Sequence, residues 1–163
     1  MWGPAQPLSP APEPRFIPSE PIQAVRSEFD TLGLIAYAAS MQGKPYRVAG
    51  DTPADGFDCS GLVYHVFHQF DLELPRNAAA MAGTLPEVSL NKIVATDLLF
   101  FNTQHAPFSH VGIYLGDGRF VHAPSPQTGR VIISKVANRY WKTRLTAARR
   151  PALVSVALGA VAP

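Results

Sequence analysis

The stretch on which the fold depends is residues 58–63, which read Asp58-Cys59-Ser60-Gly61-Leu62-Val63. An amphipathic run follows the cysteine, and its apolar residues recur at the spacing of one helix face: Leu62, Val63, Val66, Phe67 and Phe70. Asp58 is a good N-cap residue, so Cys59 is expected at the first helical position. The helix dipole and the unpaired N–H groups there are expected to lower the thiol pKa and favour the nucleophilic thiolate. The alternative is a small buried hydrophobe, the commonest fate of a free cysteine.

Length and composition indicate a single globular domain. The chain has 163 residues, of which 47% are apolar, enough to bury a core of its own. Charged residues make up only 16%, and the net charge of +2 is too small to predict a nucleic-acid partner. The single cysteine excludes an internal disulfide, and no Cys/His cluster has zinc-binding spacing, so no metal site is expected.

Positive charge is concentrated in residues 130–150. This segment holds seven of the fourteen basic residues of the chain and contains no Asp or Glu. Its basic side chains are Arg130, Lys135, Arg139, Lys142, Arg144, Arg149 and Arg150. Either an anionic partner or a solvated basic face accounts for such a segment.

The two ends of the chain differ from its middle. Residues 1–21 carry seven prolines and lack the basic start and apolar core of a secretory signal, so we expect a disordered lead-in. A chain that begins after a removed signal would look the same. Residues 152–162 are apolar but about half as long as the ~20 residues of a membrane span, which favours a C-terminal tail or edge strand over residues 152–163. The folded domain is therefore predicted for residues 22–151.

Helical patterns precede strand patterns within this domain. Apolar residues keep a helical period over 22–41 and after Cys59, and a short helix is expected over 76–81. A loop rich in Pro, Gly and Asp, residues 44–57, leads into the cysteine helix. Strands are expected at 98–101, 111–115, 119–123 and 131–133. This order predicts an α+β domain with a largely antiparallel sheet.

Two histidines lie on one predicted hairpin, and its register decides whether they meet. If residues 116–118 form the loop, Leu115 faces Arg119, and His110 and His122 point to the same side of the sheet, with Cα atoms about 7–8 Å apart. A two-residue loop would send them to opposite faces. On the first register, His110 can take the proton of Cys59 while His122 fixes the tautomer of His110. The alternative is two unrelated strand histidines.

The other three histidines are weaker candidates. His65 and His68 lie beyond the first turn of the cysteine helix, where we expect solvated side chains. His105 lies in the loop 102–107 and has no periodic context. A catalytic base is therefore sought on the hairpin.

The blocks around the cysteine and the two hairpin histidines together resemble the NlpC family of papain-like cell-wall cysteine peptidases. They read DCSGLV at 58–63, SHVGIY at 109–114 and FVHA at 120–123. The likeness runs from about residue 35 to residue 150 and includes PYR at 45–47, LPR at 74–76, DLLFF at 97–101, YWK at 140–142 and ARR at 148–150. It implies a small papain-like fold, in which the nucleophile helix packs on an antiparallel β-sheet that carries both histidines.

The resemblance implies a catalytic role for each matching residue. Cys59 matches the family nucleophile, His110 the general base and His122 the polar residue that orients the base. Tyr46 matches a tyrosine that helps to stabilise the oxyanion, together with the backbone N–H of Cys59. The alternative for Tyr46 is an aromatic lid over the core.

Other matching positions concern substrate binding and structure. Asp58 and Ser60 match residues that help to hold the amine end of the substrate, although capping explains Asp58 equally well. Arg76 and Asp97 match recurrent positions that we interpret as structural. The chain departs from the family pattern at residues 47–50, which usually contain paired glycines, and at residue 96, where a glycine is common and this chain has threonine. Both departures are expected to lie beside the cleft.

The function that the resemblance implies is hydrolysis of peptide bonds in peptidoglycan stem peptides, through a thioester and without metal or cofactor. The bond is either D-alanyl–diaminopimelate in a crosslink or γ-D-glutamyl–diaminopimelate within a stem. Residues 74–76 and 140–150 look most like Gram-negative, lipoprotein-type members that open crosslinks. We expect a monomer in the cell envelope, periplasmic or anchored to the outer membrane, with no transmembrane segment in this chain. The alternatives are a non-catalytic peptidoglycan-binding or scaffolding module with an inert cysteine, and a phage-tail lysin or toxin of the same fold.

Overall fold

The computed structural model describes residues 20–152, and the side chains of residues 30–152. Its helices are α1 (Glu20–Ser40), α2 (Cys59–His68), α3 (Ala78–Thr84) and α4 (Arg139–Arg144), with a 3₁₀ turn η1 (Leu90–Lys92). Its strands are β1 (Asp51–Thr52), β2 (Gly56–Phe57), β3 (Glu87–Val88), β4 (Leu98–Phe101), β5 (His110–Gly116), β6 (Arg119–His122), β7 (Ile132–Lys135) and β8 (Leu145–Arg149). The predicted lead-in, residues 1–21, and the predicted tail, residues 152–163, fall almost wholly outside the described residues.

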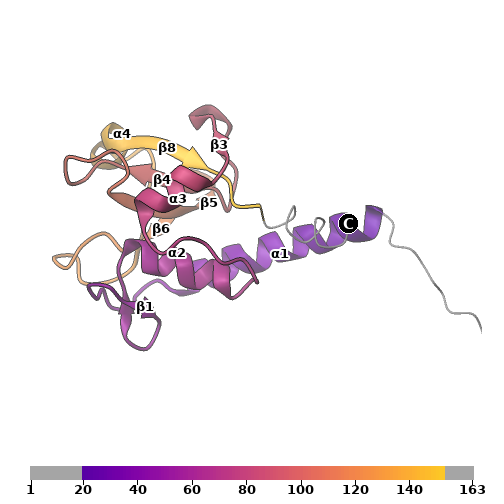
Figure 1. Cartoon of the computed structure of the whole chain (residues 1–163), viewed down its shortest axis with the longest axis horizontal. Helices are drawn as coiled ribbons and strands as arrows, with labels where there is room; N and C mark the ends of the chain where they lie inside the picture. Colours follow the sequence, from indigo (N-terminus) through magenta and orange to yellow (C-terminus); the bar gives the residue numbers. More distant parts are fainter. Residues whose placement is uncertain (1–19, 153–163) are drawn as a thin grey trace, which may run out of the picture.

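The strands form one antiparallel sheet of six and a separate pair. The sheet has the order β3-β8-β4-β5-β6-β7, and β1 pairs with β2 in the smaller ribbon. Helices α1 and α2 lie on one side of the sheet, and α4 lies on the other side beside β8 (Figure 1). This is the α+β architecture that the order of helical and strand patterns predicts. No helix within the described ranges is both long and apolar enough to span a bilayer.

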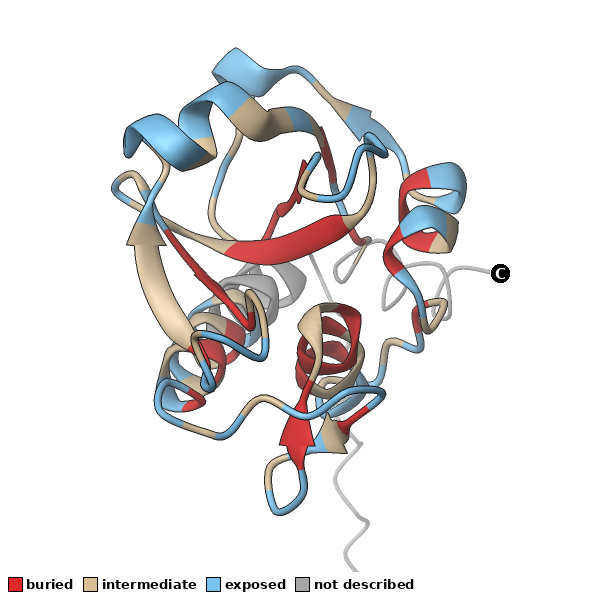
Figure 2. Ribbon diagram, turned by 90° about the vertical axis from the view of Figure 1, so that its left-hand side faces the viewer, coloured by how far each residue is buried: buried red, intermediate tan, exposed pale blue. Residues whose placement is uncertain are grey.

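Each face of the sheet packs against its own apolar cluster, because side chains alternate along a strand. On β4, Leu98 and Phe100 face the cluster that includes α2, whereas Leu99 and Phe101 face a second cluster that includes Trp141 of α4. All four β4 side chains are fully buried. Figure 2 shows the buried residues gathered in the central strands and α2, with exposed residues over α4 and the loops. Rings of the hairpin histidines lie in the second cluster, against Phe101 and Trp141.

Helix α2 begins where the sequence predicts. The Oδ1 atom of Asp58 accepts a hydrogen bond of 2.7 Å from the backbone N–H of Gly61, so Cys59 is the first helical residue. A side chain at Gly61 would clash with the carbonyl oxygen of Gly50, which shows how closely the preceding loop approaches the helix start. The helix ends at His68, slightly before the end of the apolar pattern. Asn77 caps α3 in a similar way, so that helix begins at Ala78, two residues after the predicted start at residue 76.

The β5–β6 hairpin has the predicted register but not the predicted loop. Tyr114 pairs with Phe120, as the prediction requires, while Gly116 rather than Leu115 pairs with Arg119. The turn is therefore the two residues 117–118, which on parity alone would place the histidines on opposite faces. A β-bulge between Tyr114 and Gly116 adds one residue to β5 and restores the parity. Both histidines consequently lie on one face of the sheet.

The sequence prediction missed β8, although this strand pairs with β4 inside the sheet. Its alanines and arginine have low strand propensity, so no local pattern marks it. Arg149 at its end is buried and donates a 2.8 Å hydrogen bond to the carbonyl oxygen of Ala82. Arg150 pairs at 2.8 Å and 3.0 Å with Asp97, which is fully buried. Two of the basic residues in segment 130–150 thus hold the fold together, and Asp97 is structural as predicted. The short strands β1, β2 and β3 and the helix α4 were also missed.

Candidate active site

The cysteine lies at the start of α2, where the helix meets strand β5. The backbone N–H groups of Val111 and Ser60 hydrogen-bond the sulfur and lower the pKa of the Cys59 thiol. Burial of this largely buried side chain has the larger effect and raises that pKa above its ordinary value, and the nearby carboxylate of Asp58 adds to the rise. The prediction that the helix start lowers the thiol pKa is therefore wrong in its net direction, because desolvation outweighs the N–H groups.

The two hairpin histidines form a hydrogen-bonded pair. Nε2 of His110 and Nδ1 of His122 are 2.8 Å apart, and Nε2 of His122 lies 2.8 Å from Oγ of Ser134 on β7. Both rings are buried, His110 at 2% exposure and His122 at 0%. Burial lowers the pKa of His110 to about 3 and that of His122 to about 2, with the neighbouring His110 adding to the second shift. Both rings are therefore neutral at pH 7.

The sulfur and the histidine pair approach each other at the start of β5. Val111, whose N–H hydrogen-bonds the sulfur, directly follows His110 in the strand. Within the part of the chain that the structure describes, no hydrogen bond joins the sulfur of Cys59 to Nδ1 of His110. The sulfur thus contacts the backbone of the residue next to His110, and one ring nitrogen of His110 is left free of the His122 contact.

Gly112 lies against the strand that carries His122, and Trp141 covers the two histidine rings. A Cβ at Gly112 would lie 2.9 Å from Cδ2 of Phe120 and 3.0 Å from Cβ of His122, so a side chain at this position would crowd the strand that carries His122. The Trp141 ring stacks on His110 at a centroid distance of 5.4 Å and meets His122 edge-on at 4.7 Å. An apolar cover of this kind keeps water from the bond between the two rings and strengthens it. Sequence reasoning missed both Ser134 and Trp141 as site residues, because only the β6–β7 register and the docking of α4 bring them to the histidines.

Tyr46 lies near the cysteine, as predicted. Burial raises the pKa of the Tyr46 hydroxyl, and the nearby charges of Cys59 and Asp58 raise it further. Its backbone is held by a 2.9 Å hydrogen bond from its N–H to the carbonyl oxygen of Gly129. The phenol therefore stays protonated at neutral pH and can donate a hydrogen bond.

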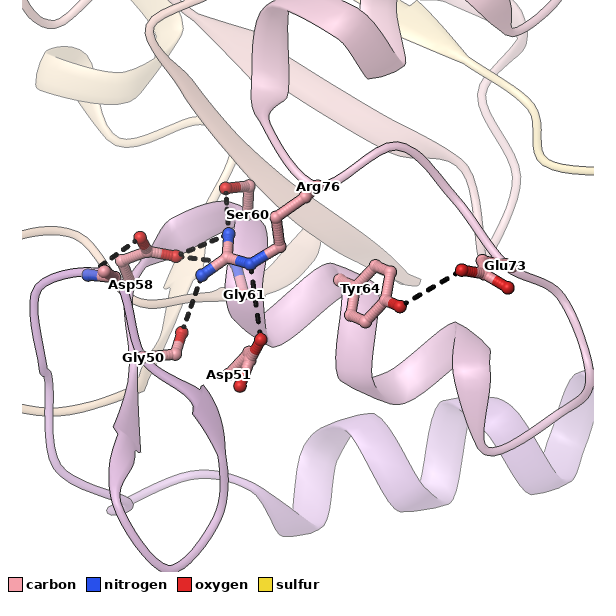
Figure 3. Close-up of polar contacts among 9 residues, drawn as sticks. Gly50, Asp51, Asp58, Ser60, Gly61, Tyr64, Glu73 and Arg76 are labelled. Carbon is pink, nitrogen blue, oxygen red and sulfur yellow. Dashed lines mark hydrogen bonds and ion pairs between the residues drawn. The ribbon is translucent and has the colours of Figure 1, made fainter.

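Arg76 ties Asp58 and Ser60 to the loop before the helix (Figure 3). Its guanidinium donates to Oγ of Ser60 at 2.8 Å and to the carbonyl oxygen of Gly50 at 3.1 Å. It also pairs with Asp58 at 3.2 Å and with Asp51 at 3.5 Å. Asp58 is both the helix cap and a partner of Arg76, so both predicted substrate-binding side chains already have internal partners. The interpretation of Arg76 as structural agrees with these contacts.

The remaining histidines lie away from the pair. His65 accepts or donates a 2.7 Å hydrogen bond with the hydroxyl of Tyr37 on α1, and His68 and His105 are exposed. Within residues 20–152, no group of three or more His, Cys, Asp or Glu side chains is placed to hold a metal ion. A cavity of about 560 Å³ between β3 and the end of β8 contains none of the predicted site residues, so it is separate from this site.

The comparison with protein families agrees with this geometry. The model of the NlpC/P60 family matches residues 43–150. The chain belongs to the NlpC/P60 family. The match includes the cysteine helix, the hairpin and α4, so it covers every residue of the candidate site.

Relatives and solved structures of NlpC/P60 proteins extend the comparison. The Escherichia coli (strain K12) protein named Murein DD-endopeptidase MepS/Murein LD-carboxypeptidase is 39% identical over 150 residues, 85% of this chain and 78% of that protein. The Gamma-DL-glutamyl hydrolase of Bacillus subtilis (strain 168) is 42% identical over 110 residues, 66% of this chain. A lipoprotein-like NLP/P60 family structure from Staphylococcus aureus has a TM-score of 0.67 at 33% identity and covers 76% of this chain and 42% of that one. These likenesses confirm the predicted papain-like α+β fold.

Several relatives are longer than this NlpC/P60 chain. The chain spans 26% of the Bacillus subtilis hydrolase and 41% of the Murein DD-endopeptidase MepH of Escherichia coli (strain K12). By contrast, it covers 97% of the crystallised NlpC/p60 domain of the peptidoglycan hydrolase SagA, with a TM-score of 0.63 at 28% identity. What the chain shares with all of them is the domain that carries the candidate site.

Proposed function

We propose that this chain is a cysteine peptidase that hydrolyses peptide bonds in the stem peptides of peptidoglycan. The observation that carries the proposal is the line of hydrogen bonds from His110 through His122 to Ser134, beside the start of the cysteine helix. Membership of the NlpC/P60 family and the names of murein endopeptidases among the relatives support the class of reaction.

The hydrogen-bonded line is compatible with the tautomers that the reaction needs. His110 acts as base through Nδ1, so its Nε2 carries the hydrogen and donates it to Nδ1 of His122. His122 then carries its own hydrogen on Nε2 and donates it to the hydroxyl of Ser134. The same arrangement stabilises the positive charge that His110 gains when it takes the thiol proton.

The proposed reaction starts from a neutral thiol and a neutral imidazole. Because burial raises the pKa of Cys59 and lowers that of His110, a resting thiolate–imidazolium pair is disfavoured, so the proton passes to His110 only in the step in which the sulfur attacks the scissile carbonyl carbon. The developing oxyanion accepts hydrogen bonds from the Tyr46 hydroxyl and the backbone N–H of Cys59, and one such donor is worth about 3–4 kcal/mol of transition-state stabilisation. His110 next protonates the leaving amine, and water hydrolyses the thioester to release the acid and restore the thiol.

The bond we favour is D-alanyl–diaminopimelate in a crosslink. The support is the relative whose length this chain largely covers, which is named a DD-endopeptidase. The γ-D-glutamyl bond within a stem is the second candidate, because a relative named Gamma-DL-glutamyl hydrolase is similarly identical over the shared domain. Either substrate places the proposed site of action in the cell envelope, outside the inner membrane. We expect the enzyme to act as a monomer.

Product analysis on defined muropeptides tests the proposal. We expect the unaltered protein to convert a crosslinked muropeptide dimer to monomers, which mass spectrometry identifies, and Cys59→Ala to give none. His110→Ala should be equally inactive, whereas His68→Ala, which changes an exposed histidine of α2, should retain activity. Equal product from the unaltered protein and Cys59→Ala would refute the proposal, and cleavage of an uncrosslinked stem alone would select the γ-D-glutamyl bond.

A further inference from the structure

A polar groove runs along α4 and past the ends of β4 and β6. It consists of two adjoining cavities of about 380 Å³ and 780 Å³ that share Thr103 and Tyr140 in their walls. The first is completed by Gln104, Pro124, Ser125, Gln127, Thr128 and Trp141. The second is completed by Asn102, His105, Thr143, Arg144, Leu145 and Thr146. We call the two cavities together the α4 groove.

The chemistry of the α4 groove suits an extended peptide that carries negative charge. Its walls present amide and hydroxyl side chains, which both donate and accept hydrogen bonds, and no Asp or Glu from residues 30–152 lines them. Among the described side chains, the guanidinium of Arg144 is its one permanent cation, held over the Tyr140 ring with Cζ at 3.6 Å from the centroid. Its hydrogen bonds to the carbonyl oxygen of Tyr140 and the hydroxyl of Thr143 both use Nη1. No carboxylate among residues 30–152 forms an ion pair with it. Its other N–H groups remain available to a ligand.

The contacts of the other basic residues single out Arg144. Arg149 and Arg150 are bound by Ala82 and Asp97 inside the fold. Lys142 is exposed on the same helix and lines neither cavity of the α4 groove. Of the seven basic residues in segment 130–150, Arg144 is therefore the one that faces the α4 groove.

The position of the α4 groove relates it to the leaving side of the substrate. His110 must reach the leaving amine to protonate it, so that part of the substrate passes close to His110 and to the Trp141 ring stacked on it. The first cavity begins at Trp141 and at Pro124 and Ser125, which follow His122 closely in the chain. A peptide that continues from the leaving amine past Trp141 would reach the α4 groove at this point.

Resting on the function proposed above, we propose that the α4 groove binds the amine-bearing, leaving-side part of the stem peptide and that Arg144 pairs with a carboxylate of that part. The pairing makes Arg144 a specificity-determining residue: a substrate whose carboxylate is amidated loses the charged partner. A guanidinium binds a carboxylate through two parallel hydrogen bonds, which an amide cannot reproduce.

Binding to an inactive form tests this inference separately from catalysis. In Cys59→Ala, titration calorimetry measures the affinity for a crosslinked muropeptide dimer with free carboxylates and for the same dimer fully amidated. We expect adding Arg144→Gln to weaken binding of the free dimer about tenfold and to leave the amidated dimer within about twofold. Arg144→Lys should restore part of the loss, and Lys142→Gln, a matched charge removal on α4, should change neither affinity.

The outcomes separate the inference from the proposed function. If Arg144→Gln and Lys142→Gln weaken both dimers equally, Arg144 makes no specific contact and the inference is wrong, whether or not the unaltered protein cleaves. If the unaltered protein cleaves no muropeptide but the Arg144 difference persists, the groove binds the peptide and the proposed function fails instead. Because each variant is compared on two ligands, a partial loss of folding lowers both affinities and cannot imitate the expected result.

Discussion

Replacing Ser134 by alanine tests the hydrogen-bonded line on which the proposed chemistry depends. His122 is fully buried, and its Nε2 has Ser134 Oγ as a partner at 2.8 Å. Ser134→Ala leaves that buried N–H without an acceptor, which costs about 1–3 kcal/mol. His122 escapes the cost by moving its hydrogen to Nδ1, where it donates to His110 instead. His110 must then carry its hydrogen on Nδ1, the atom that has to accept the thiol proton.

The size of the effect follows from this competition between tautomers. A shift of about 1–3 kcal/mol against the productive tautomer lowers kcat about 5- to 150-fold, since 1.4 kcal/mol corresponds to a factor of ten. KM should change little, because Ser134 lies behind His122 and away from the cysteine. Steady-state kinetics on a crosslinked muropeptide give kcat, and ¹⁵N chemical shifts of the imidazoles report which ring nitrogens carry hydrogen. Ser134→Thr retains a hydroxyl and should stay near the unaltered rate. A folded Ser134→Ala protein with unchanged kcat and unchanged ring shifts would refute the reasoning.

Three further predictions concern stability. The pKa values of His110 and His122, about 3 and about 2, lie below the ordinary 6.5, so the unfolded state binds more protons as the pH falls below 6.5. The free energy of unfolding should therefore fall between pH 7 and pH 5 by about 2 kcal/mol per histidine. Urea unfolding of the double variant His110→Asn, His122→Asn should show a flatter pH dependence. Arg76→Met leaves the buried hydroxyl of Ser60 and a loop carbonyl without their donor, and urea unfolding should show a loss of about 1–3 kcal/mol, whereas Arg119→Met on the exposed start of β6 should lie within about 0.5 kcal/mol. Thr96 has φ of 81°, a conformation strained for a β-branched residue, so Thr96→Gly should raise the unfolding free energy by about 1 kcal/mol; a loss in the same assay would contradict this.

Two residues at which the sequence departs from the family pattern have backbone angles that favour glycine. Thr96, where the family resemblance implies glycine, and Ala49, within the block 47–50 where it implies paired glycines, both have positive φ, 81° and 63°. The backbone therefore keeps a conformation that glycine adopts freely, and at Thr96 and Ala49 this conformation is strained because the residue has a Cβ atom. Sequence comparison located these positions, but only the backbone angles show what the substitution costs.

The sequence by itself determined the features that depend on near neighbours along the chain. The cap at Asp58 and the placement of Cys59 at the helix start follow from hydrogen bonds and periodicities that span a few residues. The net rise of the thiol pKa could not be predicted in this way, because it depends on how deeply the packed loop and sheet bury the sulfur.

Only the tertiary structure decided which distant residues complete the site. The bulge before Gly116 keeps the histidines on one face despite a two-residue turn, and β8 enters the sheet without a strand-like pattern. Ser134 and Trp141 reach the histidines through the β6–β7 register and the docking of α4. These contacts join segments that are far apart in the chain, so their energies depend on sheet order and packing, which no local pattern of residues encodes.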